Sequence, residues 1–457
     1  MKVTAVLLAA GQGTRMKSDL PKVLHPLCGK PMLWHVLEAL KSATTEKPVV
    51  VVGHGAQEVK EYLGQSAECV LQEPQLGTAH AAMQAEALLK GRTDYVIVTY
   101  ADMPLLRGET FQQLLETQRA NPGSFSLLTV IADDPRGFGR IVRKANGMVA
   151  AIVEEYVATP EQRQIKELNV GAYCFKADWL WGALHRIEQN PKKGEYYLTD
   201  IVELAVRENL PVQAVVHDDF METIGINTRV HLSEAEAALR MRINRIHMLN
   251  GVSMIDPAST YIDMDVKIGR DTTILPNTYL HGKTIVGAGN TIGPNTIVRD
   301  SKIGDRCKVL ASVLEGARLE DDVDMGPFAR LRKGAHLKSH VHMGNFGEVK
   351  DSTLHEGVKM GHFSYIGNAN VGANTNIGAG TITANYDGEK KNSTEIGEDV
   401  FIGSDTMLVA PLKLGDRART GAGAVVTKNV PEDTLVVGMP ARAIRKLERK
   451  TKKQENH

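Results

Sequence analysis

A glycine-rich segment near the start of the chain carries the first chemical signal. It reads Leu8-Ala9-Ala10-Gly11-Gln12-Gly13-Thr14-Arg15-Met16, and Pro21-Lys22 follows shortly after it. Glycines let backbone N–H groups approach phosphate oxygens, and Arg15 and Lys22 bring positive charge to the same place. Met16 stands where a dinucleotide fingerprint has its third glycine, and no Gly-Lys-Ser/Thr of a Walker loop follows. The segment therefore predicts a phosphate-binding loop of another kind.

A second group of reactive side chains stands far along the chain. It comprises Arg330-Leu331-Arg332, Glu348-Val349-Lys350, Gly361-His362-Phe363-Ser364-Tyr365 and Asn385-Tyr386-Asp387-Gly388. Histidine has a reference pKa of about 6.5, which suits a base that takes a proton from an amine near neutrality. We take His362 as the candidate base because cationic and aromatic residues accompany it. His342 and His355 are interpreted as surface or structural residues.

The first 228 residues alternate short apolar runs with helical stretches. Strands are predicted at Val3–Leu8, Val49–Val52 and Tyr95–Thr99, and helices at Pro31–Lys41, Ala56–Leu63 and Thr78–Lys90. This alternation predicts a doubly wound α/β sheet. Ligands bind such sheets beyond the carboxyl ends of the strands, where Gly11–Arg15 and Asp102 are expected.

The second half has a period of six. Aliphatic residues recur at Ile262, Ile268, Ile274, Leu280, Val286, Ile292 and Val298, several are followed four positions later by Thr, and Gly often comes directly after the aliphatic position. The register slips at Ile303, blurs over 310–355 and returns from Met360 onwards. A triangular coil with six residues on each side fits this pattern, with the aliphatic side chain inside and Gly easing the corner. The hexads therefore predict a parallel β-helix, with a regularly spaced β-sandwich as the alternative.

These periods divide the chain into four parts. We expect an α/β domain in 1–228, a linker helix in 229–250, a β-solenoid in 251–442 and a basic tail in 443–457 that is solvated or partly helical. In the linker, Leu232, Leu239, Ile243 and Ile246 stand at helical spacing among charged residues.

The composition excludes several classes of protein. The 457 residues include 54 basic and 54 acidic ones, so the charge suggests no nucleic acid and no membrane partner. Cys28, Cys69, Cys174 and Cys307 are too far apart in sequence for a metal or disulfide framework, which favours a reduced cytoplasm. The apolar start is interpreted as a buried strand rather than a signal peptide. We expect a soluble, cytoplasmic protein.

The loop motif resembles the signature of the sugar-1-phosphate nucleotidyltransferases. With the hexads, the chain is similar from about residue 3 to about residue 442 to the bacterial bifunctional N-acetylglucosamine-1-phosphate uridyltransferase/glucosamine-1-phosphate acetyltransferase family. The resemblance implies a Rossmann-like nucleotidyltransferase domain followed by a left-handed parallel β-helix.

The resemblance also implies roles for residues of the first half. Arg15 and Lys22 would be catalytic, and the nucleotide contacts would be Leu8, Ala9, Ala10, Gly11, Gln72, Gly77 and Thr78. The sugar phosphate would contact Tyr100, Asp102, Gly139, Glu154, Asn169 and Asn227, with Ala101 standing where the family's Tyr-Gly-Asp motif has Gly. Asp102 and Asn227 would hold Mg²⁺, a cation that prefers oxygen ligands.

In the second half the resemblance makes His362 the base and Glu348 its orienting carboxylate. Glucosamine-1-phosphate would contact Arg332, Lys350, Tyr365 and Asn376. Acetyl-CoA would contact Ala379, Asn385, Tyr386, Ser404, Ala422 and Arg442, the last because Met439 stands where some members have Arg.

The function implied is acetyl transfer from acetyl-CoA to glucosamine-1-phosphate, then uridylyl transfer from UTP to N-acetylglucosamine-1-phosphate with release of pyrophosphate. The product, UDP-N-acetylglucosamine, is a cell-wall precursor. The alternatives are a sugar-1-phosphate nucleotidyltransferase with a purely structural β-helix, and a non-catalytic regulator with the same domains. Because the acetyl-transfer residues are widely spaced in sequence, we expect a homotrimer in which His362 works beside CoA contacts of a neighbouring chain.

Overall fold

The structure, a computed structural model, describes residues 1–191 and 193–446. It divides into two compact units, and the boundary falls between Leu239 and Arg240. No helix among these residues has the length and apolar character needed to cross a membrane.

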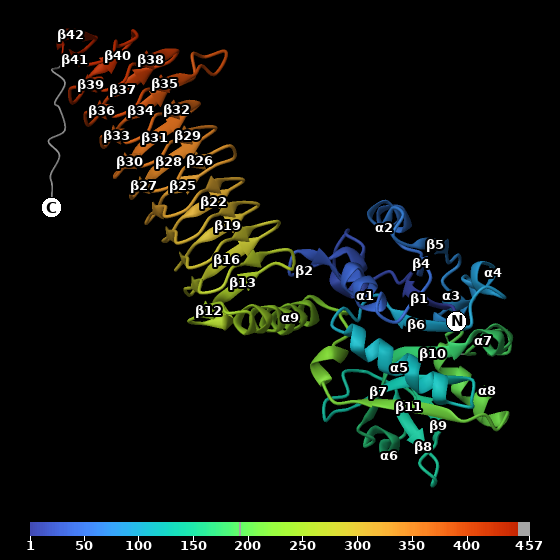
Figure 1. Cartoon of the computed structure of the whole chain (residues 1–457). Coiled ribbons are helices and arrows are strands. Elements are labelled where there is room, and N and C mark those ends of the chain that lie inside the picture. The colour runs from blue at the N-terminus through green and yellow to red at the C-terminus, as the bar shows by residue number, and fades with distance from the viewer. Residues whose placement is uncertain (192, 447–457) are drawn as a thin grey trace. The chain divides into compact units, whose positions relative to one another are not determined.

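A nine-stranded sheet forms the centre of the first unit (Figure 1). Its path is β11-β7-β10-β6-β1-β4-β5, and β8 and β9 branch from β10. All pairs along this path are parallel except those of β10 with β6 and β7. The strands are β1 (Val3–Ala9), β4 (Val49–Val52), β5 (Glu68–Leu71), β6 (Tyr95–Tyr100), β7 (Phe125–Ile131), β8 (Arg140–Arg143), β9 (Val149–Val153), β10 (Glu167–Lys176) and β11 (Val212–His217), and a separate ribbon pairs β2 (Pro26–Leu27) with β3 (Lys30–Pro31).

Helices cover both faces of this sheet. The helices are α1 (Met32–Leu40), α2 (Ala56–Leu63), α3 (Thr78–Met83), α4 (Glu86–Leu89), α5 (Gly108–Ala120), α6 (Pro160–Arg163), α7 (Ala177–Leu184) and α8 (Ile201–Arg207). Alternate residues of β1 enter two separate cores: Val6 packs with α3, α7 and α8, whereas Leu7 packs with α1, α2 and α5. The doubly wound α/β fold is confirmed. The helix predicted over Thr78–Lys90 is broken into α3 and α4 by a turn.

The predicted linker helix is α9 (Arg229–Leu249). Ala235, Leu239 and Ile243 stand four residues apart and are all buried, as the helical spacing requires. Near its end, Asn244 is fully buried and donates hydrogen bonds to the carbonyl oxygens of Pro257 and Thr260, at 2.8 and 2.9 Å. These bonds tie the helix to the first coil of the second unit.

The second unit is a solenoid of three sheets (Figure 1). The 12-stranded sheet contains β12 (Ser253–Met254), β15 (Thr273–Ile274), β18 (Thr291–Ile292), β21 (Lys308–Val309), β24 (Asp324–Met325), β27 (His342–Met343), β30 (Lys359–Met360), β33 (Asn376–Ile377), β36 (Phe401–Ile402), β39 (Arg419–Thr420), β41 (Thr434–Gly438) and β42 (Ala441–Lys446). The 10-stranded sheet contains β13 (Thr260–Ile262), β16 (Thr278–His281), β19 (Ile297–Arg299), β22 (Val313–Glu315), β25 (Arg330–Leu331), β28 (Gly347–Lys350), β31 (Ser364–Gly367), β34 (Ile382–Ala384), β37 (Met407–Val409) and β40 (Val425–Val426).

The nine-stranded sheet of the solenoid completes each coil. It contains β14 (Lys267–Ile268), β17 (Ile285–Val286), β20 (Lys302–Ile303), β23 (Arg318–Leu319), β26 (His336–Leu337), β29 (Thr353–Leu354), β32 (Ala369–Val371), β35 (Thr394–Ile396) and β38 (Leu412–Leu414). The chain visits the three sheets in turn, so each strand pairs in parallel with the strand one coil later. The predicted left-handed parallel β-helix of hexapeptide repeats is confirmed.

The hexads predicted the inside of the coil correctly. Leu280 and Ile292 are completely buried, and so are the threonines four positions after the repeat, such as Thr278 and Thr296. The glycines that follow the aliphatic position do not share one role. Gly293 has the φ > 0 corner conformation (φ 100°), whereas in the coil of Gly269 the later residue Asp271 (φ 59°) has it. Gly269 is required for another reason, because a Cβ there would lie 2.6 Å from the backbone of Gly287 in the next coil.

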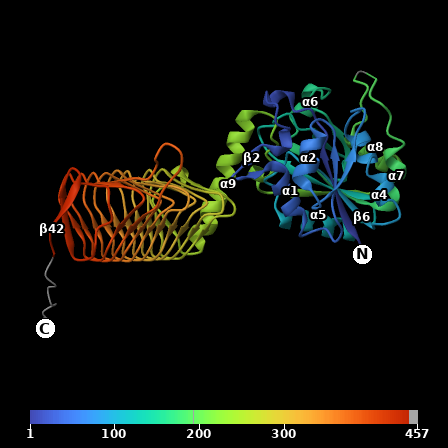
Figure 2. The ribbon, with the colours of Figure 1, turned by 90° about the horizontal axis from the view of Figure 1, so that it is seen from above.

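Two irregularities interrupt the stack. One loop projects between β34 and β35 and is drawn in orange in Figure 2. At the end, β41 and β42 form an antiparallel hairpin. The tail expected from residue 443 as solvated or partly helical begins within an exposed strand, and residues 447–457 of that predicted tail lie outside the described part of the chain.

Candidate functional site

A cleft of about 490 Å³ lies at the carboxyl ends of β1 and β6. Most residues predicted for the first site line it: Leu8, Ala9, Ala10, Gly11, Arg15, Lys22, Gln72, Gly77, Thr78, Tyr100 and Asp102. The sequence interpretation missed Gln75, whose Nε2 donates to the Ala10 carbonyl at 2.6 Å, and Glu195, which also lines the cleft. The fold thus gathers segments that are far apart in the sequence, from Leu8 to Glu195, at one sheet edge.

Positive and oxygen-bearing side chains converge in this cleft. Lys22 Nζ donates to Asp102 Oδ2 and, at 2.8 Å, to Asn227 Oδ1. Arg15 Nη2 donates to the same Asn227 oxygen at 3.0 Å. The Ile226 N–H bonds the Asp102 carbonyl at 2.9 Å, which fixes the Asn227 loop against the strand end. One carboxylate oxygen and one amide oxygen therefore meet around a cationic group.

The glycine loop is shaped by a close approach of two segments. Gly13 has φ 62°, and it precedes the short 3₁₀ turn Thr14–Met16. A Cβ on Gly13 would lie 2.8 Å from the Cβ of Lys22. Glycine is required here both by the backbone conformation and by the position of Lys22. Ala101, where the family motif has Gly, is completely buried, so its methyl group faces the core.

The segment predicted to contact the base is held rigidly. Gln72 is buried, and its Nε2 donates to the Gly77 carbonyl at 2.9 Å. Gly77 has φ 99°, and a Cβ there would lie 2.6 Å from the Tyr196 carbonyl. Thr78 Oγ1 accepts a bond from the Leu198 N–H at 2.9 Å. These contacts leave a fixed backbone edge beside the cleft.

The predicted sugar contacts lie deeper in the first unit. Burial raises the pKa of Glu154, whose carboxylate accepts a hydrogen bond from Thr199 at 3.0 Å. Burial, and then the nearby Glu154, raise the pKa of Tyr100 far above its usual range. Asn169 Nδ2 donates to the Tyr173 hydroxyl at 2.8 Å, and the backbone N–H of Asn169 donates to the Gly139 carbonyl at 2.9 Å. Gly139 and Asn169 are thus neighbours, as are Glu154 and Tyr100.

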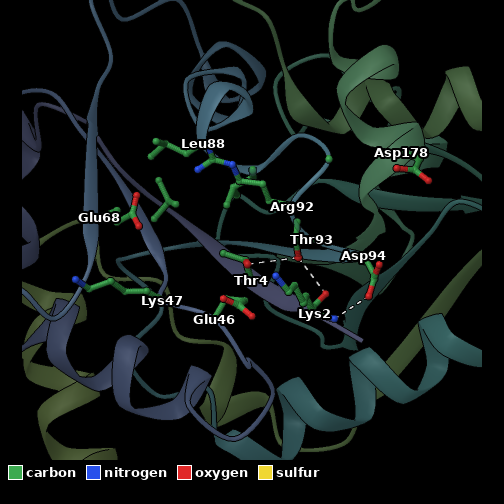
Figure 3. A pocket seen from close by; sticks show the side chains of 13 residues that line it. Lys2, Thr4, Glu46, Lys47, Glu68, Leu88, Arg92, Thr93, Asp94 and Asp178 are labelled. Atoms are coloured by element: carbon green, nitrogen blue, oxygen red, sulfur yellow. Dashed lines mark hydrogen bonds between the residues drawn. The ribbon is translucent and has the colours of Figure 1, made fainter.

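A second cavity of the same unit lies away from this cleft (Figure 3). It encloses about 540 Å³ at the amino-terminal ends of the strands, where Lys2 precedes β1, Thr4 lies near the start of β1, and Thr93 and Asp94 precede β6. Lys2 N–H bonds Asp94 at 2.7 Å, and Thr93 bonds the Lys2 carbonyl at 3.0 Å. No site was predicted at this end, and hydrogen bonds join Lys2, Thr4, Thr93 and Asp94 to one another.

The second group of predicted residues is aligned by the pairing of coils. Met343 pairs with Met360 and Glu348 with Tyr365, so residues between them are matched at an offset of 17. The pairs Met360–Ile377, Ile377–Ile402 and Phe401–Arg419 continue the alignment upwards at offsets of 17, 25 and 18. The matched positions at this corner form one column, which we call the corner column: Asn345, His362, Ala379, Ser404 and Ala422.

The corner column changes one expectation. His362 and the predicted CoA contacts Ala379, Ser404 and Ala422 stand on successive coils of one chain, and neighbouring strands lie about 4.8 Å apart. Their wide spacing in sequence therefore does not require a neighbouring chain to gather them. At the top, Val436 pairs with Thr420, which places the hairpin that carries Arg442 directly after Ala422.

The 10-stranded sheet flanks the column with charged residues. Arg332 Nη1 donates to Glu348 Oε1 at 3.0 Å. The Lys391 ammonium, followed by burial and then Arg332, lowers the pKa of Lys350. Lys391 belongs to the projecting loop, and the sequence interpretation missed it. Three cations thus lie close together, which makes this face suited to an anion such as a phosphate.

Polar groups also meet above Gly367. A Cβ on Gly367 would collide with the Tyr365 hydroxyl and would lie 2.8 Å from Asn385 Nδ2. Tyr386, on the loop, is exposed. Asn376 lies on β33 of the 12-stranded sheet, on the other flank of the column. The predicted residues of the second site therefore surround one corner.

The expected partner of His362 differs in the structure. His362 Nδ1 lies 3.1 Å from Asn345 Oδ1, whereas the carboxylate of Glu348 accepts its bond from Arg332. The physical reason is the register, because Glu348 is matched with Tyr365 on the sheet while His362 is matched with Asn345 at the corner. A turn asparagine gave no signal in the sequence.

Comparisons with known proteins agree with both halves. The family described as MobA-like NTP transferase domain matches residues 5–166, and the bacterial transferase hexapeptide family (six repeats) matches 265–300 and 393–428. The bifunctional protein GlmU of Geobacillus sp. (strain WCH70) is 47% identical over 437 residues, covering 96% of this chain and 95% of that protein. The proteins of the same name from Geobacillus thermodenitrificans and Listeria monocytogenes serovar 1/2a are 48% and 44% identical, covering 96% and 94% of this chain and 95% and 94% of their own lengths.

Asp200 beside the sugar contacts gives the first site a pH-dependent stability. Burial, and then Glu203 and Glu154, raise the pKa of Asp200 to about 6, against about 3.9 in an unfolded chain. The protonated Asp200 carboxyl therefore makes its full contribution to the free energy of unfolding below about pH 4. This contribution is lost as the pH rises through about 6. We predict that Asp200→Asn raises the melting temperature at about pH 7.5 and changes it little at about pH 4.5.

Thermal unfolding followed by differential scanning calorimetry at the two pH values checks this. Asp178→Asn, at an exposed aspartate in the first turn of α7, is the matched control and should show no such difference. An equal effect of Asp200→Asn at both pH values would contradict the raised pKa.

Proposed function

We infer, because the chain belongs to the family of bifunctional GlmU proteins, that its two units carry the two successive reactions that lead to UDP-N-acetylglucosamine. The chain is a bifunctional transferase that combines a nucleotidyltransferase domain with a hexapeptide transferase domain. We propose that the second unit acetylates glucosamine-1-phosphate and that the first unit couples the product to UMP from UTP. The observation that carries this proposal is the presence of two complete residue clusters, one in each unit.

In the first unit the proposed reaction is attack of a sugar phosphate oxygen on the α-phosphorus of UTP. The new P–O bond forms as the bond to pyrophosphate breaks, and no protein nucleophile is needed because the attacking phosphate is already ionised. Arg15 and Lys22 would neutralise the triphosphate and the charge that develops on it. Gln72, Gly77 and Thr78 would hold the base, supported by their rigid backbone edge.

Asp102 and Asn227 are the proposed holders of Mg²⁺. Their oxygens already converge on the Lys22 ammonium, so the donor set fits a cation that prefers oxygen ligands. When bound, Mg²⁺ supplies charge neutralisation for the phosphates. Lys22 would then move from the two oxygens to the phosphates.

The sugar of the acceptor would lie against Gly139, Glu154, Asn169 and Tyr100. The buried Glu154 carboxyl could hydrogen-bond a sugar hydroxyl, which would replace part of the solvation that burial removes. Asn169 and the Gly139 backbone would provide matched amide contacts on the other side. Tyr100, which packs against both cores of the unit, would close the pocket.

In the second unit the proposed reaction is acetyl transfer to an amine. The amine nitrogen of glucosamine-1-phosphate attacks the thioester carbonyl, His362 Nε2 takes the proton from that nitrogen, and the CoA thiolate leaves. Arg332 and Lys350, with Lys391, would hold the phosphate, and Tyr365 and Asn376 would contact the sugar. Asn385 and Tyr386 would lie beside the reacting groups.

Acetyl-CoA would extend along the corner column. Its acetyl end would lie at His362 and Ala379, and the remainder would run past Ser404 and Ala422 towards Arg442. The small side chains of Ala379 and Ala422 suit close approach of an extended ligand. This path is supported by the register, which spaces these positions at single-coil steps.

We propose that the protein assembles as a homotrimer and acts in the cytoplasm. Apolar side chains such as Ile285 and Ile297, each 39% exposed, project from the solenoid faces, and packing three prisms about a threefold axis would cover them with closed symmetry. None of the four cysteines forms a disulfide, which agrees with a reducing compartment. The domain boundaries proposed above near residues 228 and 250 lie at the ends of α9, whereas the boundary proposed near residue 442 falls inside β42.

A two-product assay tests the proposed function. With glucosamine-1-phosphate, acetyl-CoA, UTP and Mg²⁺, we expect release of both free thiol and pyrophosphate. Asp102→Ala should lower pyrophosphate formation by at least about 100-fold and leave thiol release unchanged, because it alters the first unit alone. His362→Ala should do the reverse when N-acetylglucosamine-1-phosphate is supplied.

Loss of both activities in either folded variant would contradict two independent sites. Thiol release that survives His362→Ala would remove this residue from the reaction. Pyrophosphate formation without any thiol release by the parent protein would favour a nucleotidyltransferase with a structural β-helix.

The assembly is tested by sedimentation equilibrium. We expect the mass of three chains over a wide concentration range, because covering the exposed isoleucines is favourable by about 25 cal/mol per Å². Ile297→Lys, on an outward face, should weaken the assembly, whereas Lys308→Ala on the 12-stranded sheet, which carries neither isoleucine, serves as the control. A stable, active single chain would contradict the trimer.

A further inference from the structure

One contact at the corner column fixes the protonation pattern of His362. Its Nδ1 lies 3.1 Å from Asn345 Oδ1. An amide oxygen can only accept a hydrogen bond, so Nδ1 must be the donor. In the neutral imidazole, the lone pair is then on Nε2. This is the tautomer that a base needs if it takes the amine proton through Nε2.

The fold brings these two residues together through glycines. Gly344 and Gly361 precede Asn345 and His362 in adjacent coils, and a Cβ on Gly344 would collide with the Gly361 carbonyl. The Gly344 N–H bonds the Met360 carbonyl at 2.8 Å. Because the strands on both sides of the corner keep the offset of 17, Asn345 lies directly beneath His362.

We propose that Asn345 is a positioning residue for His362, which it holds as the Nδ1–H tautomer by an uncharged hydrogen bond. The proposal rests on the proposed acetyl transfer. A carboxylate at this place would favour the imidazolium and so reduce the fraction of His362 able to accept a proton near neutrality. An amide orients the ring without this effect.

The surroundings agree with an uncharged corner. The column neighbours of the pair are Pro327 below and Ala379 above, and neither carries charge. The charged and titratable groups on the flanking strands are His342 and Lys359 on the 12-stranded sheet, and Glu348, Lys350 and Tyr365 on the 10-stranded sheet. Glu348 is occupied by Arg332, so its charge is compensated.

The solenoid offers a matched control pair. His355 Nε2 lies 3.0 Å from Asn370 Oδ1, also between adjacent coils but on the nine-stranded sheet side. This pair has the same chemistry and lies away from the corner column. Substitutions at Asn370 therefore report the effect of breaking a histidine–asparagine bond without touching the proposed site.

Acetyl-transfer kinetics give the first test. Asn345→Ala should lower kcat by about 10- to 100-fold, part of the general-base contribution of about 10²–10⁴, with KM for glucosamine-1-phosphate unchanged. Asn345→Asp should restore most of kcat at high pH, because a carboxylate oxygen accepts the same bond, and should move the acidic limb of the pH profile up by about one unit. Asn370→Ala should change neither quantity. An unshifted limb in Asn345→Asp, or a normal kcat in Asn345→Ala, would overturn the proposal.

A chemical measurement separates this proposal from the acetyl-transfer function. Diethyl pyrocarbonate modifies neutral imidazole, so its rate at the His362 peptide against pH, followed by mass spectrometry, reports the pKa of His362 without any turnover. Asn345→Asp should raise that pKa by about one unit and leave the rate at the His355 peptide unchanged. Asn370→Asp should instead change the rate at the His355 peptide and leave the pKa of His362 unchanged. A shift at His362 in a protein without acetyltransferase activity would refute the function but not the contact, and no shift would refute the contact.

Discussion

Backbone hydrogen bonds between successive coils of the solenoid fix which residues lie above one another, and the second site depends on this register. Each turn adds 16 to 18 residues, except where the projecting loop makes the step 25. Inward aliphatic residues and threonines keep the coil closed, and glycines such as Gly344 let adjacent backbones touch. Outward-facing positions can then hold reactive side chains. They form columns in which successive residues lie about 4.8 Å apart.

In the first unit, a common sheet edge brings distant residues together. Parallel strands β1 and β6 finish at the same sheet edge, so the glycine loop and Asp102 become neighbours although they are far apart in sequence. The Ile226–Asp102 backbone bond then brings Asn227 to the same place. In both units, regular hydrogen bonding supplies the rigid frame, and short irregular segments supply the reactive groups.

Periodicity made most of the fold predictable. The hexads mark the inward positions directly, and the helical spacing in 229–249 gave α9 with its bounds. The cluster of the first site came from family resemblance rather than from spacing, because no local pattern links Lys22 to Asn227. Asn345 and Lys391 were missed for a physical reason. A turn asparagine and a loop lysine look ordinary in sequence, and their positions follow from a register that is blurred over 310–355 and reset by the insertion.

Hydrogen exchange of the intact protein with and without CoA tests whether the register of one chain assembles an extended ligand site along the corner column. We expect CoA to slow exchange together in three short segments, around 378–380, 403–405 and 421–423, which are separated in sequence and adjacent only in the coil stack. Segments at the other corners of the same coils should exchange unchanged. Protection confined to a single segment, or spread evenly over all corners of these coils, would show that the corner column is not the CoA site.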